Sequence, residues 1–99
     1  MKTRRCGVAG MFYPRDPHHL EQLLEKLFSI KEAGVDAMGV VSPHAGYPYS
    51  GEISALAYTA IPASFAGTFV VIGPSHRGYR TCTSLIPWET PLGIVDTDA

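Results

Sequence analysis

The sequence AMGVVSPHAGYPYSG at residues 37–51 carries the pattern that decides the fold. Its first part, residues 37–42, is a short apolar run with a β-branched pair that stops at Pro43, which is typical of a strand covered on both faces. A second apolar run, TFVVI at residues 68–72, ends in the turn GPSHRG. A helix-like segment lies between the two runs. The order strand, helix, strand predicts a βαβ unit.

The helix between these runs is predicted to start after Ser50, a candidate N-cap, and to end near Pro62. Its apolar side would be formed by Ile53, Leu56, Ala57 and Ala60. The two strands of a βαβ unit are parallel, and their carboxyl ends meet at one edge of the sheet. We therefore expect an α/β fold, a three-layer α/β/α sandwich with a mainly parallel sheet, in which ligands bind beyond the strand ends.

An earlier helix is predicted from Asp16, which can cap it, and from Pro17, which suits the first helical position. It should end before Gly34, and its apolar face would contain Leu20, Leu23, Leu24, Leu27 and Phe28. Residues 82–96 predict two further short strands around the turns at Pro87 and Thr90-Pro91.

One histidine follows each predicted strand. His44 comes two residues after the first strand and His76 four residues after the second. Because neighbouring strands lie about 4.8 Å apart, we expect the two ring nitrogens to face one crevice, roughly 3–5 Å from each other, where they could bind one metal ion. The alternative is that each histidine is only hydrogen-bonded in a polar loop. The second helix should begin beside this crevice, where free backbone N–H groups could favour an anionic substrate group.

Other residues near the two turns have structural as well as functional interpretations. Pro43 would simply terminate a strand, and Gly46 could serve either a tight turn or close approach of a ligand. The hydroxyl of Tyr47 could reach a substrate, or its ring could pack beneath the helix. Ser75 lacks the surroundings of a catalytic nucleophile.

Composition excludes several classes of function. A formal net charge of −1 and a pI near 6.4 give no general attraction to nucleic acid or to an anionic membrane. No apolar run approaches the roughly 18–20 residues of a membrane helix, and the N-terminal residues do not form a secretion signal. Cys6 and Cys82 form no CxxC motif, so we expect two reduced thiols in a cytoplasmic protein.

Four stretches together resemble the opening part of the Memo family, also called AmmeMemoRadiSam system protein B. They are VAGMFYP at residues 8–14, SPHAGYPYSG at 42–51, VVIGPSHRG at 70–78 and TPLGIVDTD at 90–98. That family is similar in fold to the class III extradiol ring-cleavage dioxygenases, which are non-haem iron enzymes. The resemblance implies a metal-type pocket in which His44 and His76 are the catalytic and metal-binding residues. The pocket would be bordered by Tyr13, Pro43, Gly46, Tyr47 and Ser75.

The chain also departs from the family pattern. Family members are longer, and their further pocket histidine and late cysteine have no counterpart here. Two histidines leave an ion under-coordinated, because a non-haem iron site normally has two histidines and a carboxylate. We therefore expect residues 1–99 to form a single partial domain, truncated at its C-terminus. Fe(II) or another divalent metal would bind weakly or not at all.

Three hypotheses about function follow. The first is a metal-dependent redox role on an unknown small substrate. The second is a non-catalytic module that binds a protein or peptide, as the family's reported signalling role in animals suggests, and the third is a fragment without activity. The expected partners are a small molecule or peptide, the remaining C-terminal part of the domain, or a second copy through self-association. Neither nucleic acid nor a membrane is expected.

Overall fold

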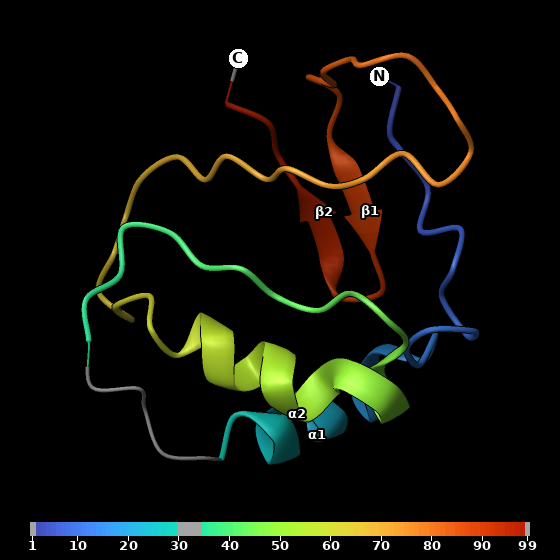
Figure 1. Cartoon of the computed structure of the whole chain (residues 1–99). Coiled ribbons are helices and arrows are strands. Elements are labelled where there is room, and N and C mark those ends of the chain that lie inside the picture. The colour runs from blue at the N-terminus through green and yellow to red at the C-terminus, as the bar shows by residue number, and fades with distance from the viewer. Residues whose placement is uncertain (1, 30–34, 99) are drawn as a thin grey trace.

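The computed structural model describes residues 2–29 and 35–98. Four elements follow one another in this part of the chain: helix α1 at Pro17–Leu27, helix α2 at Tyr47–Tyr58, strand β1 at Trp88–Thr90 and strand β2 at Gly93–Val95. The two helices pack against each other along one side of the molecule, and the strands form a hairpin on the other side (Figure 1). Two long extended segments cross the space above α2 (Figure 1).

Helix α1 confirms the signals read from the sequence. The Asp16 carboxylate accepts a hydrogen bond from the backbone N–H of His19 at 3.1 Å, and Pro17 occupies the first turn. The cap satisfies one of the N–H groups that a helix start leaves without a partner. Leu20 is the buried residue of this helix, with only 4% of its surface exposed. The helix ends at Leu27, and the predicted stop at Gly34 lies outside the described residues.

Helix α2 begins earlier than the sequence predicted. Its N-cap is Gly46, and Ser50 lies inside the helix, where its hydroxyl donates to the carbonyl of Ala45 at 2.9 Å. The prediction that Ser50 caps this helix was therefore wrong. Pro48 explains the earlier start, because proline is favoured in the first turn of a helix. The N–H group that it lacks would have had no partner within the helix.

The buried face of α2 also differs from the prediction. Ser50, Gly51 and Ala55 are buried, whereas Ile53 and Leu56 are exposed. A Cβ atom on Gly51 would lie 3.1 Å from a methyl group of Leu27, so the absence of a side chain lets the two helices approach closely. Helix α2 thus carries apolar side chains on its exposed face as well as on its buried face. This pattern is typical of a helix that is covered on more than one side.

The predicted parallel sheet is not seen in the described residues. Segments 37–42 and 68–72 are extended and run in the same direction over α2, but neither is a strand (Figure 1). Backbone groups of residues 68–72 make no hydrogen bond to other described backbone groups. A parallel sheet requires cover on both faces, and here both helices lie on one side. Residues 2–29 and 35–98 thus show no α/β/α sandwich, although the chain directions of a βαβ unit are kept.

The observed hairpin confirms the predicted strand pair at the Thr90-Pro91 turn. Its strands are antiparallel, with Trp88 opposite Val95 and Thr90 opposite Gly93. The N-terminal segment joins the hairpin edge, since the Arg4 N–H donates to the carbonyl of Pro87 at 2.8 Å and its carbonyl accepts from Glu89 at 2.7 Å. This gives one isolated parallel bridge to β1, and the Arg4 guanidinium lies 4.3 Å from the Trp88 ring. No strand precedes Pro87 within residues 82–86.

The same edge brings a thiol and a carboxylate together. Sγ of Cys6 donates to Oε1 of Glu89 at 3.2 Å, and the Cys6 backbone N–H donates to the same oxygen. The hydrogen bond to Glu89, together with burial, raises the pKa of the Cys6 thiol, and the same bond lowers the pKa of Glu89. The protonated thiol is therefore favoured. The hydrogen bond between the protonated thiol and the Glu89 carboxylate stabilises the folded chain at neutral pH. This stabilisation is lost as the pH rises through the raised pKa of Cys6.

We expect Cys6 to react slowly with iodoacetamide at about pH 8.5, the ordinary pKa of a cysteine thiol, because only its thiolate is nucleophilic. Glu89→Gln removes the carboxylate charge, so the pKa of Cys6 should fall and its alkylation should become several-fold faster. Mass spectrometry of each cysteine peptide measures both rates, with exposed Cys82 as the internal control. An unchanged Cys6 rate in the variant would contradict the role of Glu89.

The molecule exposes far more surface than its size requires. Its accessible surface is 8527 Å², whereas a compact protein of this mass exposes roughly 5,500 Å² by size scaling. Much of the excess is apolar, and Val70, Val71 and Ile72 are 84%, 87% and 91% exposed. In the described part of the chain, the buried hydrophobic residues are Leu20 and three alanines, Ala9, Ala55 and Ala60. No helix in that part is long and apolar enough to cross a bilayer.

Candidate functional site

The structure brings the two predicted histidines together. Nε2 of His44 lies 3.1 Å from Nε2 of His76, and the ring centroids are 5.1 Å apart at an interplanar angle of 44°. The pair forms because segments 37–42 and 68–72 run in the same direction, and each histidine follows the end of one segment. Both side chains are exposed. One ring can donate to the other, with the roles set by the tautomer.

The distance between these nitrogens suits a shared ion. Two nitrogen donors bonded at about 2.1 Å to one ion lie roughly 3.0–3.4 Å apart in octahedral or tetrahedral geometry, and the observed separation is 3.1 Å. The donor set is incomplete, because no group of three or more His, Cys, Asp or Glu side chains capable of holding a metal occurs within residues 2–29 and 35–98. His44 and His76 therefore fit two positions of a metal site, and further donors would have to come from elsewhere.

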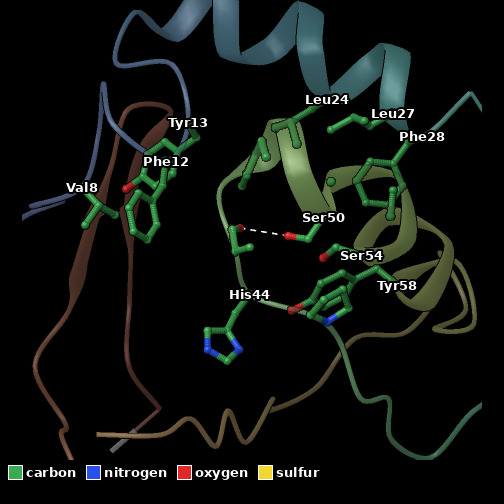
Figure 2. A pocket seen from close by; sticks show the side chains of 15 residues that line it. Val8, Phe12, Tyr13, Leu24, Leu27, Phe28, His44, Ser50, Ser54 and Tyr58 are labelled. Atoms are coloured by element: carbon green, nitrogen blue, oxygen red, sulfur yellow. Dashed lines mark hydrogen bonds between the residues drawn. The ribbon is translucent and has the colours of Figure 1, made fainter. Parts of the chain in front are cut away.

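A pocket of about 560 Å³ opens next to His44. Its floor is helix α2, and helix α1 and the N-terminal turn form its sides (Figure 2). The aliphatic and phenyl side chains in its lining are Val8, Phe12, Leu24, Leu27 and Phe28. His44 lies at the mouth, so a ligand in the pocket would lie beside this histidine (Figure 2).

The N-terminal turn is held in place by backbone hydrogen bonds. Residues 8–13 form a tight turn in which Gly10 has a φ of +88° and its N–H donates to Tyr13. A positive φ is accessible to glycine without steric strain. The carbonyl of Phe12 then accepts from the N–H of Tyr47 at 2.8 Å, which ties the turn to the start of α2.

Two tyrosines meet where the turn and the helix join. The rings of Tyr13 and Tyr47 lie 5.5 Å apart between centroids, tilted by 41°, and both line the pocket. Burial is the main cause that raises the pKa of each phenol. Both hydroxyl groups therefore stay protonated at neutral pH and can donate a hydrogen bond.

Of the other three predicted pocket residues, Pro43 lines the pocket, whereas Gly46 and Ser75 are not among its lining residues. Gly46 is the N-cap of α2 with a φ of −57°, and a Cβ there would meet no protein atom closer than 3.6 Å, so the turn itself does not require a glycine. The Ser75 hydroxyl accepts from the N–H of Tyr79 at 2.8 Å, which closes the short loop that contains His76. Sequence reasoning missed Ser54 and Tyr58, whose spacing along α2 could have revealed their common face.

The expected anion site at the start of α2 is wrong. The N–H of Tyr47 donates to Phe12, and the N–H groups of Tyr49 and Ser50 both donate to the carbonyl of Gly46. Pro48 has no N–H. The first turn thus offers no free donor to an anionic group.

The sequence of this chain matches a known protein family. The model of the family "Memo-like protein" matches residues 4–99. The chain belongs to the Memo-like family. It is 43% identical over 100 residues to a MEMO1 family protein of Methanosarcina barkeri and 44% identical over 103 residues to one of Methanosarcina acetivorans. A MEMO1 family protein of Methanothermobacter thermautotrophicus is 41% identical over 110 residues.

These Memo-like relatives are considerably longer than this chain. The alignments cover 96%, 99% and 97% of this chain but 36%, 37% and 39% of the three relatives. The chain therefore spans less than two fifths of the length of these three relatives. The histidine pair and the pocket both lie within the part matched by the family model.

Proposed function

We propose that this Memo-like chain contributes His44 and His76 to a divalent metal site that supports a redox reaction on a small ligand held in the adjacent pocket. The observation that carries the proposal is the 3.1 Å separation of the two Nε2 atoms at the mouth of that pocket. Imidazole is a good ligand for Fe(II) and for similar transition metals.

Each part of the site has a definite role in this proposal. The two imidazoles hold the ion in their neutral form, because a ligating nitrogen cannot carry a proton. The apolar pocket orients the ligand and keeps water from its body. A bound Fe(II) ion would supply one-electron chemistry and open positions for small ligands. Further donors would come from polypeptide beyond the described residues or from a partner chain.

The experiment is a titration of the chain with Co(II) under anaerobic conditions, followed by visible absorption and calorimetry. We expect weak binding that His44→Ala and His76→Ala each abolish. The control is the double variant His18→Ala/His19→Ala, which removes two exposed imidazoles from helix α1 and should leave binding unchanged. If the control loses as much binding as the single variants, the ion is not held by the pair.

A second candidate function is a non-catalytic module that binds a protein or peptide. The exposed apolar run at residues 69–72 favours it, because contiguous exposed apolar surface marks interaction sites. A chain that takes up no Co(II), yet binds a peptide with or without the His44→Ala substitution, would favour the module over the metal site.

A further inference from the structure

We propose that the pocket beside His44 selects an uncharged ligand with an apolar body and one hydroxyl-type hydrogen-bond donor, and that the Ser54 hydroxyl anchors this polar end. The inference rests on the proposed function, since the pocket borders the same histidine pair. It adds the chemical class of the ligand and a residue that determines specificity.

The lining of the pocket first indicates an uncharged ligand. None of the residues around it is an Asp, Glu, Lys or Arg. A charged group brought into such a lining would lose water without gaining an ion partner, which is costly. The first turn of α2 cannot compensate an anion either, because its N–H groups are already bonded to the carbonyls of Phe12 and Gly46.

The size of the pocket indicates a compact body. Its volume of about 560 Å³ lies within the range of roughly 300–1,000 Å³ that is usual for small-molecule sites. The apolar walls come from both helices and from the N-terminal turn (Figure 2). A fused two-ring hydrocarbon is of suitable size and can be used as a probe.

The hydrogen bonds of Ser42 and Ser54 indicate where the polar group of the ligand would lie and that it would be a donor. Oγ of Ser54 lies 2.6 Å from Oγ of Ser42, and the Ser42 hydroxyl donates to the carbonyl of Pro43 at 3.0 Å. The Pro43 carbonyl can only accept, so the arrangement that satisfies both contacts has Ser42 donating to Pro43 and Ser54 donating to Ser42. The oxygen of Ser54 then keeps lone pairs that can accept from a ligand.

Ser54 is the suitable acceptor for a second reason. It is half-buried and lines the pocket, and Figure 2 shows it among the other lining side chains. Ser50 is 8% exposed and its hydroxyl is already directed to Ala45. A ligand donor such as an alcohol would therefore meet Ser54 with its body against the apolar walls.

The test uses three probes that differ in one group: naphthalene, 2-naphthalenemethanol and 2-naphthoate. Binding to the metal-free chain in EDTA is measured by equilibrium dialysis and probe fluorescence. We expect 2-naphthalenemethanol to bind about threefold to tenfold more tightly than naphthalene, as one net hydrogen bond gives. The charged 2-naphthoate should bind more weakly than either.

Variants then locate the hydrogen bond. Ser54→Ala should lower the affinity for 2-naphthalenemethanol to that for naphthalene and leave naphthalene binding unchanged, which also shows that the pocket is intact. Ser54→Thr retains the hydroxyl and should restore the preference. The matched control is Ser64→Ala, an exposed serine that does not line the pocket.

Several results would overturn the inference: no binding of any probe, equal binding of all three, tightest binding of 2-naphthoate, or an undiminished alcohol preference in Ser54→Ala. None of these would touch the metal proposal, because Co(II) binding is measured without a ligand and probe binding without a metal. Conversely, loss of the metal proposal would leave the probe preference standing.

Discussion

Val71→Lys should convert a self-associating chain into a monomer. Residues 69–72, FVVI, form an extended apolar segment whose backbone groups have no partner among the described backbone groups. Val71 is 87% exposed at its centre. No charged residue occurs from position 60 to 75, so nothing in this stretch opposes pairing with another strand. Such a segment is a template for edge-to-edge association, and a central lysine is a common means of preventing it.

Analytical ultracentrifugation over a range of concentrations measures this effect. We expect concentration-dependent association of the unmodified chain and at least a tenfold weaker association of Val71→Lys, about 1.4 kcal/mol. Met11→Lys is the matched control, because it adds the same charge at an exposed position on the N-terminal turn. A chain that sediments as a monomer at every concentration would contradict the prediction, as would equal effects of the two lysines.

Leu20→Ala should unfold the chain. Leu20 is the one large side chain in the buried hydrophobic set of the described residues, and it lies in α1. Truncating a buried leucine to alanine typically costs about 2–5 kcal/mol. A chain with so small a core has little stability in reserve, since even ordinary domains have only about 5–15 kcal/mol.

Far-UV circular dichroism during urea unfolding measures the loss. The control is Leu23→Ala on the same helix, where the leucine is only half-buried and the same truncation should cost clearly less. If both variants unfold at the same urea concentration as the unmodified chain, the burial of Leu20 does not hold the structure together.

Local signals in the sequence predicted local structure well. Asp16 and Pro17 fixed the start of α1, because a cap and a first-turn proline act within a few residues. The turn between β1 and β2 was predictable for the same reason. The Ser50 cap failed because Gly46 and Pro48 lie nearby and provide a competing helix start four residues earlier.

Pairing over long distances was not predictable in the same way. Segments 37–42 and 68–72 have strand-like composition, but a strand exists only when a neighbour completes its hydrogen bonds and cover is present on both faces. The proximity of His44 and His76 could still be anticipated, because it depends only on the common direction of the two segments. Their role as metal ligands stays a prediction. Ser54 was missed although its four-residue spacing from Tyr58 places both residues on one face of α2.

The contact between the N-terminal segment and the hairpin has a consequence for folding kinetics. The hydrogen bond from Cys6 to Glu89 joins residues 83 positions apart, so it closes a loop that contains most of the chain. Loop closure costs entropy that rises with loop length, and contacts of such separation form slowly. Helices α1 and α2 need much shorter loops and can form earlier. The N-terminal segment and the hairpin therefore meet late in folding, after the two helices have formed.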